Sequence, residues 1–400
     1  MNKRFANIMV LLTIILMDLL TGMEFDLFVP SFPQLQHYFN LKPFWVEALL
    51  SVNFMGYCLS LLLVGELADR YGRKPIILIG LMIFVIGNIF CLWIPLYPFF
   101  LFGRFLQGVG IAAPAILSFL IIADLYPLKD QPFLLAMLNG AKNISVAAAP
   151  VFGSYITLYF HWQGNFIALL LLGAITLLMS LLFVPFYKQL QDKETDQQQS
   201  YISLFRSKPL LLLIITLLFI YVPYWIFVGM SPLLYIKDLG VSLSHFGFYQ
   251  GVLALVFAIG SLLYGFLMKR YNYNQKKLLI VSLQILFVSL VIIVIVSFQN
   301  STNPLLITLS FLPFIISQIM PSTLIYPLCI NFIPQAKGRI SAIIGGANLV
   351  FSSVGLQIAG YFYQGSFRNI GIVISFYILI AVITLYFVIS NKEIMKIEFK

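Results

Sequence analysis

The 400-residue sequence is 61% hydrophobic and only 10% charged, and its formal net charge is +10. Soluble domains average roughly 45–50% apolar and about 25% charged residues, so this composition excludes a soluble globular protein and indicates an integral membrane protein. The apolar runs are long and continuous, which excludes the alternating strands of a membrane β-barrel. We therefore expect an all-α membrane protein.

Twelve apolar runs are long enough to cross a bilayer, since a spanning helix needs about 20 such residues. Lys3 and Arg4 precede the first run, but acidic residues interrupt it and no small-residue cleavage site follows. We therefore expect a retained first span and not a signal peptide. The expected spans are residues 7–29, 46–68, 76–96, 99–123, 133–158, 165–187, 209–231, 246–268, 278–298, 303–327, 339–361 and 369–390.

The spans form two sets of six, separated by the only long polar stretch, residues 188–208. This stretch is rich in Gln and charged residues and has no apolar period, which predicts a linker. GELADRYGRK from Gly65 and GFLMKRYNYN from Gly265 share Gly, Leu, Arg and Tyr 200 residues apart. The sequence thus predicts a six-helix half over 1–187, a linker over 188–208 and a second six-helix half over 209–400, as in membrane proteins built from internal repeats.

The basic residues predict the orientation of the chain. Nineteen of the 24 Lys and Arg residues lie on the side that holds both termini, three lie on the opposite side, and Arg104 and Lys142 lie within spans. The positive-inside rule assigns the side with both termini to the cytoplasm. The net charge is therefore a topology signal, and we expect no nucleic-acid partner. The three cysteines show no metal-ligand spacing, so we expect no metal site and no cofactor.

The loop between the second and third expected spans, residues 65–74, resembles the motif G-x-L-a-D-r-x-G-r-k of the major facilitator superfamily. Gly65 permits a close helix approach and Gly72 a tight turn, while Asp69 can pair with basic groups or cap a helix N-terminus. In this family the loop latches one conformational state. The resemblance implies a conformational latch that consists of Gly65, Asp69, Arg70, Gly72, Arg73 and Asp124.

The fourth expected span contains RFLQGVG, residues 104–110, which resembles the motif R-x-x-q-G-x-g of proton-coupled members of the superfamily. An arginine does not lose its proton in a protein, so a buried Arg104 must find an acid, an amide or a carbonyl. Asp18 and Asp26 are its candidate partners. The alternative is an arginine that only ties helices together.

The fifth expected span contains APVFG, residues 149–153, which is similar to the element G-P-x-x-G of antiporters, with Ala149 in place of the first glycine. Pro150 removes a helix hydrogen bond and bends the span. Gly153 allows close helix packing. The resemblance favours antiport.

The stretch MDLLTGMEFDLFVP, residues 17–30, places Asp18, Glu24 and Asp26 in the first span, where each ionised acid costs about 2.5–3.5 kcal/mol. On a helix, Asp18 and Asp26 are about 80° apart and share a face, whereas Glu24 points elsewhere, toward a neighbouring helix or the outer mouth. A shielded carboxyl group can be neutral and a wetted one ionised, which is the chemistry of a proton carrier. We expect proton coupling at Asp26 and Asp18, with Glu24 and Arg104 contributing; the alternative is that the acids only form ion pairs.

Lys142 lies about ten residues into the expected span 133–158, near the midplane of the bilayer. An intramembrane lysine faces a cavity or a partner. Three roles remain open: a pair with Asp18 or Asp26, contact with an anionic or zwitterionic substrate, and snorkelling. With Lys142, the candidate substrate-binding residues are Asn53, Tyr57, Asn139, Tyr221, Tyr224, Trp225 and Gln318.

LFVP at 27–30 and GRISA at 338–342, taken with these motifs, look like the drug/proton antiporter branch of the bicyclomycin-resistance (Bcr/CflA) type. The resemblance implies a twelve-span major facilitator fold, with a central cavity open to each side in turn. It implies proton-coupled antiport that exports a small organic compound or drug across a bacterial-type inner membrane, by a monomer without enzymatic activity. The alternatives are proton-coupled transport of an anionic or zwitterionic metabolite, such as a carboxylate siderophore or an amino acid, and a non-transporting membrane sensor.

Overall fold

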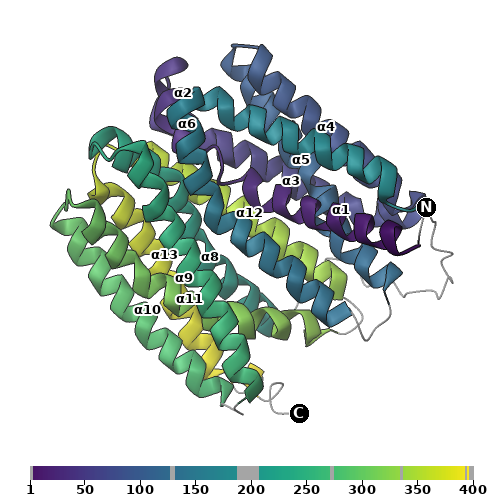
Figure 1. Cartoon of the computed structure of the whole chain (residues 1–400). Coiled ribbons are helices and arrows are strands. Elements are labelled where there is room, and N and C mark those ends of the chain that lie inside the picture. Colours follow the sequence, from purple (N-terminus) through teal and green to yellow (C-terminus); the bar gives the residue numbers. More distant parts are fainter. Residues whose placement is uncertain are drawn as a thin grey trace. The chain divides into compact units, whose positions relative to one another are not determined.

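The computed structural model describes residues 3–126, 131–186, 207–270, 274–333, 337–391 and 394–395 (Figure 1). Within these residues, eleven helices are long and apolar enough to cross a membrane. The all-α membrane architecture that the composition predicts is therefore confirmed. The expected linker, 188–208, lies outside the described residues except for Ser207 and Lys208.

One compact unit consists of Met1–Glu194 together with Ser242–Gly251. Its described helices follow one another along the chain with short connections (Figure 1). They are α1 (Lys3–Glu24), the short η1 (Val29–Ser31), α2 (Phe32–Tyr38), α3 (Pro43–Tyr71), α4 (Arg73–Trp93), α5 (Tyr97–Leu125) and α6 (Gln131–Phe183).

Helix α6 contains both the fifth and the sixth expected spans, and it explains why eleven candidate spans replace the expected twelve. His161 inside α6 has φ 55° and ψ −170°, which is not helical, so two helices meet at a kink there. No loop separates them, and a single candidate span covers Met137–Phe183. The boundary between the two expected spans therefore falls at one residue and not in a polar connection.

Close backbone contacts hold α3, α4 and α5 together. A Cβ atom at Gly108 of α5 would overlap the carbonyl oxygen of Asn53 on α3, and one at Gly110 would overlap the backbone of Phe84 on α4. Small residues allow helix backbones to approach closely in membranes, where the hydrophobic effect does not drive association. Helix α5 thus packs against both α3 and α4, and α1 packs along α6.

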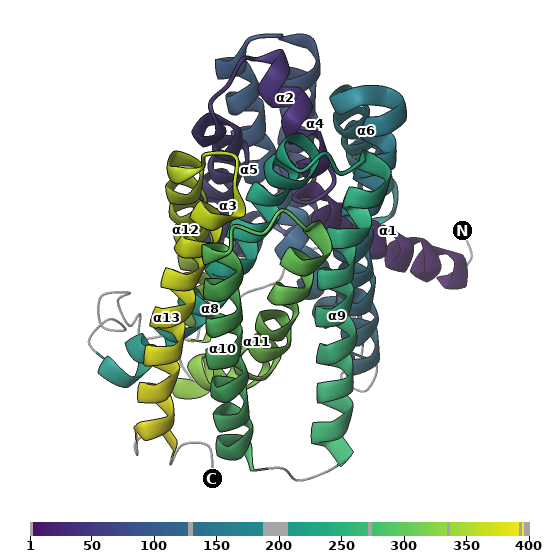
Figure 2. The ribbon, with the colours of Figure 1, turned by 90° about the vertical axis from the view of Figure 1, so that its left-hand side faces the viewer.

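The second compact unit consists of Thr195–Val241 and Val252–Lys400. Within it, α10 packs against α11 and α13, and α8 packs against α12 and α13 (Figure 2). The side chain of Asn303 accepts hydrogen bonds from the backbone N–H groups of Leu305 and Leu306, at 3.0 and 3.3 Å, and so caps α11. The elements are α8 (Lys208–Pro232), η2 (Leu233–Asp238), α9 (Leu243–Arg270), which contributes to both units, α10 (Gln275–Phe298), α11 (Pro304–Phe332), α12 (Lys337–Phe362) and α13 (Phe367–Ser390).

Candidate functional site

The three acids of the first span are all buried, but only two of them lie on α1. Asp18 and Glu24 are 0% exposed and Asp26 is 2% exposed. Helix α1 ends at Glu24, and Asp26 lies in the turn before η1 begins at Val29. The expectation that Asp18 and Asp26 share a helix face is therefore wrong, because the helical period stops before Asp26.

Glu24 is the ion-pair partner of Arg104. The distance from Arg104 NH1 to Glu24 Oε1 is 3.2 Å, and both side chains are 0% exposed. The expectation that Asp18 or Asp26 pairs with Arg104 is thus corrected. Asn53 Nδ2 donates to the same Oε1 atom at 2.7 Å and to the carbonyl oxygen of Arg104 at 3.0 Å. The three residues tie α1, α3 and α5 together inside the bundle.

Further contacts compensate the buried guanidinium group of Arg104. Its Nε atom donates to the carbonyl oxygen of Leu49 at 3.3 Å, and its NH1 atom donates to Gln107 Oε1. Gln107 Nε2 donates in turn to Asn88 Oδ1 at 2.7 Å. The Arg104 Cζ atom lies 3.9 Å from the centre of the Phe28 ring, a cation–π distance. A buried charge is tolerated only with partners of this kind.

Asp18 lies between a hydroxyl group and an ammonium group. Ser118 Oγ donates to Asp18 Oδ1 at 3.1 Å. Lys142 is half-buried and interacts electrostatically with Asp18, but in the described part of the chain no carboxylate lies within 4.0 Å of its Nζ atom. Asn139, one turn earlier on α6, is exposed and donates to the carbonyl oxygen of Leu135 at 3.0 Å. The cation of Lys142 therefore faces Asp18 without a direct ion pair.

Several buried carboxylate oxygens have no hydrogen-bond partner among the described residues. They include one oxygen each of Asp18, Glu24 and Asp26, and both oxygens of Glu47 on α3. Glu47 is 0% exposed. Buried polar atoms are normally hydrogen-bonded, so an acid with two unpartnered oxygens requires an explanation. Glu47 was not predicted, although an acid within the expected span 46–68 is itself the signal of a functional residue.

Tyr57 lies one helical turn after Asn53 on α3. Its ring centre is 5.7 Å from that of Phe25, in the turn that follows α1. Phe25 also contacts the ring of Phe54 at 5.2 Å. Tyr57 therefore lies next to the turn that holds Asp26, and so close to the buried acids.

The loop motif forms a small ion-pair network at the turn between α3 and α4. Gly72 adopts φ 95°, which a side chain would strain. Arg73 NH1 lies 2.5 Å from Asp69 Oδ1, and Arg73 Nε lies 3.2 Å from Asp124 Oδ2 on α5. The expectation of a close helix approach at Gly65 is wrong, since a Cβ atom there would meet no atom of the described residues within 4 Å.

The expected bend motif lies within α6. Pro150 is inside the helix. A Cβ atom at Gly153 would overlap the carbonyl oxygen of Leu27, which follows α1 in the chain. At Gly153, α6 thus approaches the backbone of the segment after α1 closely, and this segment also holds Asp26.

The remaining candidates lie in the second unit. The hydroxyl group of Tyr221 forms a hydrogen bond with the side chain of Ser322. The rings of Tyr224 and Trp225 are edge to face, with centres 5.7 Å apart. Gln318 on α11 is 4% exposed. In the described part of the chain, no group of three or more His, Cys, Asp or Glu residues could hold a metal ion.

Buried acids and bases inside a bundle of spanning helices are typical of the ion and substrate pathways of membrane transport proteins. The model of the Major Facilitator Superfamily matches residues 14–356. The chain therefore belongs to the major facilitator superfamily. It is a multi-pass membrane protein of this family.

Known proteins give a similar picture. The multidrug resistance protein MdtL of Escherichia coli (strain K12) is 29% identical over 234 residues, a match that spans 58% of this chain and only 58% of MdtL. The D-xylose-proton symporter has a TM-score of 0.75 at 16% identity, over 95% of this chain and 97% of that chain. The nucleoside transporter NupG has a TM-score of 0.74 at 14% identity, over 98% and 100%. At these identities the two structures show the fold alone.

Proposed function

We propose that this protein is a secondary transporter that exports a small organic compound or drug in exchange for protons, by alternating access. The observation that carries the proposal is the cluster of buried carboxyl groups at the end of α1, next to two intramembrane cations. Ionisable groups at this depth are expensive and mark proton relays. The name of MdtL supports a drug-like cargo.

In this proposal the acids have two different tasks. Asp26 and Asp18 carry the proton, because each has a buried oxygen without a hydrogen-bond partner and, unlike Glu24, forms no ion pair within 4.0 Å in the described residues. A neutral carboxyl group tolerates such a site far better than an ionised one. Glu24 is the counter-ion of Arg104 and keeps the adjoining helices in place. Substrate binding and protonation then compete at Asp18 and Asp26.

The proposed architecture has twelve spans in two six-helix halves, 1–187 and 209–400, joined by the linker 188–208. The kink at His161 supports the division of α6 into two spans. Both termini are proposed to be cytoplasmic and the protein a monomer of the bacterial inner membrane, in the drug/proton antiporter branch. A reporter fused after Lys400 that is active only in the cytoplasm supports this orientation; activity only outside it contradicts the orientation.

A second candidate function is proton-coupled transport of an anionic or zwitterionic metabolite. It is favoured by Lys142, whose ammonium group has no carboxylate within 4.0 Å in the described part of the chain. An anionic group of the substrate could displace Asp18 as the nearest negative charge. If the loss of this charge–charge contact weakens substrate binding by about 1.4 kcal/mol, the dissociation constant rises tenfold, which is large enough to measure.

Transport into proteoliposomes with an imposed pH gradient tests the proposed function. Cationic, neutral and anionic compounds are screened, and the compound transported is then used with Asp26→Asn and Asp18→Asn. We expect both variants to lose proton-driven accumulation while substrate binding or exchange partly survives. Glu66→Gln, an exposed carboxylate on α3, is the control that keeps coupling. Full coupling in both Asp variants would remove these residues as proton carriers.

Lys142→Ala separates the two candidate substrates. If the substrate is anionic, the variant should bind it at least about tenfold more weakly, while cationic compounds are unaffected or improved. If the substrate is cationic or neutral, its binding should be unchanged or tighter. Lys42→Ala, an exposed lysine at the start of α3, is the matched control.

A further inference from the structure

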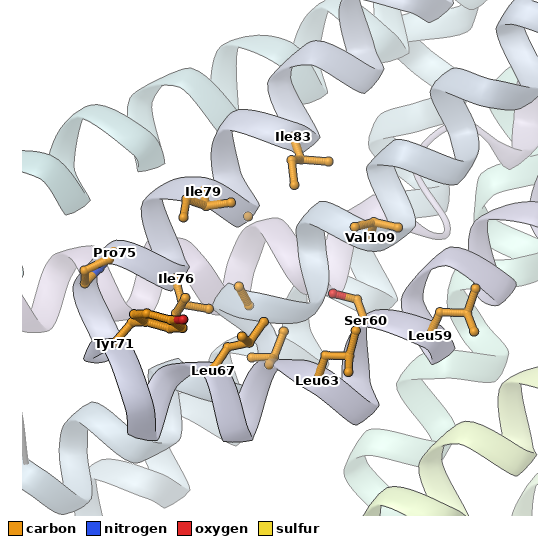
Figure 3. Close-up of a pocket in the computed structure, with 13 residues that line it drawn as sticks. Leu59, Ser60, Leu63, Leu67, Tyr71, Pro75, Ile76, Ile79, Ile83 and Val109 are labelled. Carbon is orange, nitrogen blue, oxygen red and sulfur yellow. The ribbon is translucent and has the colours of Figure 1, made fainter.

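An apolar groove of about 520 Å³ runs between α3 and α4 (Figure 3). It lies outside the acid cluster, and all its lining residues belong to the first unit. Many of them are exposed in the protein alone; Leu63, for example, is 56% exposed and Ile79 51%. The walls are Leu59, Leu63 and Leu67 of α3 and Ile76, Ile79 and Ile83 of α4.

Helix α5 forms the floor of the groove. Val109 and Ala113 of α5 line it, and a Cβ atom at Gly80 of α4 would lie 2.6 Å from the Cβ atom of Ala113. Helices α3 and α4 each pack closely on α5 but make few contacts with each other. The groove therefore forms because glycines let α3 and α4 each approach α5 closely, while a gap remains between α3 and α4.

The length of the groove matches one leaflet of a bilayer. The α3 wall runs from Leu59 to Tyr71, which is about 18 Å along the helix axis at about 1.5 Å per residue. The hydrocarbon core of a bilayer is about 30 Å thick, so that one leaflet is about 15 Å. A single acyl chain thus fits the groove lengthwise, and its polar end would lie at Tyr71.

A free positive charge lies at this end of the groove. Arg70 is exposed, and its Cζ atom is 5.3 Å from the centre of the Tyr71 ring. Arg73 is engaged by two acids, but no carboxylate of the described residues lies within 4.0 Å of Arg70, Glu66 one turn earlier included. Lys74 donates to the carbonyl oxygen of Leu181 at 2.7 Å and adds a second positive charge nearby.

We propose that this groove binds one acyl chain of an anionic phospholipid whose phosphate group lies at Arg70. The apolar walls accept the chain, and the unpaired guanidinium group selects an anionic headgroup. Basic sites between spanning helices are a general means of recognising such lipids. The proposal concerns the surface of α3 and α4 and is independent of the transported compound.

Native mass spectrometry of the full-length protein in detergent tests the headgroup preference. The protein is titrated with palmitoyl-oleoyl phosphatidylglycerol and with the corresponding phosphatidylcholine. We expect the first lipid to bind about fivefold more tightly, the equivalent of about 1 kcal/mol for one basic residue. Arg70→Gln should remove this preference. Arg368→Gln should keep it, since Arg368 is exposed and near an aromatic ring, 5.8 Å from the centre of Phe298, but belongs to the second unit and not to the groove. Equal binding of the two lipids by the unmodified protein would overturn the proposal, and so would an unchanged preference in Arg70→Gln.

Filling the groove tests the site of the acyl chain. Leu63→Trp should weaken the binding of both lipids severalfold, whereas Leu62→Trp, which is outside the groove and 46% exposed, should not. If Leu63→Trp does not fold, Ile79→Trp on α4 replaces it, with Met82→Trp, 50% exposed and outside the groove, as its control. Undiminished lipid binding in the groove variant, or displacement of the lipid by the transported compound, would contradict the proposal.

Discussion

At the scale of single residues, the ion pair of Glu24 and Arg104 dominates the interior of the first unit. Both side chains are fully buried, so water does not screen their attraction. Removal of one partner of such a pair costs about 3–5 kcal/mol, because the other charge stays buried without compensation. Asn53 adds a hydrogen bond to each partner. The pair therefore fixes α1 against α5 as well as providing charges.

We predict that Glu24→Gln and Arg104→Gln each destabilise the protein by about 3–5 kcal/mol, and that the double variant is destabilised by clearly less than the sum. Unfolding of the purified protein in detergent measures all three variants in one double-mutant cycle. Additive effects would mean that the two side chains do not interact. Glu66→Gln is the control, since its exposed carboxylate makes no ion pair within 4.0 Å among the described residues.

Glu47 should behave in the opposite way to Glu24. Both of its oxygens are buried without a partner in the described residues, and each unsatisfied polar group costs about 1–3 kcal/mol. We predict that Glu47→Met leaves the stability unchanged or raises it, whereas Glu24→Met lowers it. Thermal unfolding of the two variants gives the comparison. A large loss of stability in Glu47→Met would show that its carboxyl group has a partner.

At the scale of helices, glycine positions decide how closely α3 and α5 approach. A Cβ atom at Gly108 would overlap the carbonyl oxygen of Asn53, the residue that bonds to both partners of the buried ion pair. We predict that Gly108→Val prevents stable folding, measured as the yield of monodisperse protein. Gly140→Ala is the control: a Cβ atom there meets nothing within 4 Å among the residues that the structure describes, so folding should be retained. Normal folding of Gly108→Val would show that the close approach is not required.

The latch proposed for the α3–α4 turn rests on Arg73, which joins Asp69 to Asp124 at the end of α5. We predict that Asp69→Asn lowers the transport rate much more than the substrate affinity, because the proposed latch stabilises one conformational state of the transport cycle and the turn does not contact the acid cluster. Initial rates over a range of substrate concentrations separate the two quantities. An unchanged maximal rate in Asp69→Asn would leave the loop as a topology anchor only.

Sequence patterns predicted the helices and the loop motif, but not the partners of the buried charges. The apolar runs and the glycine at position 72 are local features of the sequence. The positive φ of Gly72 agrees with the tight turn that the motif predicts. The pairing of Glu24 with Arg104 depends on where α1 ends. The prediction assumed that the helix continues to Asp26, whereas α1 ends at Glu24. The prolines at 30 and 33 signal the break. The kink at His161 lies between the expected spans 133–158 and 165–187, so its place was predicted, but the apolar runs did not show that the two helices meet without a loop.

At the scale of the whole molecule, acidic residues are distributed very unevenly between the two halves. Between residues 209 and 391 the only acid is Asp238, whose carboxylate accepts a hydrogen bond from the Tyr363 hydroxyl group. The expected spans of residues 1–187 contain five acids, which are Asp18, Glu24, Asp26, Glu47 and Glu66. The proposed proton carriers therefore lie in the first half, whereas Tyr221, Tyr224, Trp225 and Gln318, proposed for the substrate, lie in the second.

The most direct test of proton-coupled export is the lumenal pH of proteoliposomes that contain the purified protein, a pH-sensitive dye and the transported compound, without an initial pH gradient. As the compound leaves, antiport predicts acidification of the lumen, because protons enter in exchange, and this acidification should be absent in Asp26→Asn. Efflux of the compound without a change in lumenal pH, or with alkalinisation, would contradict the account.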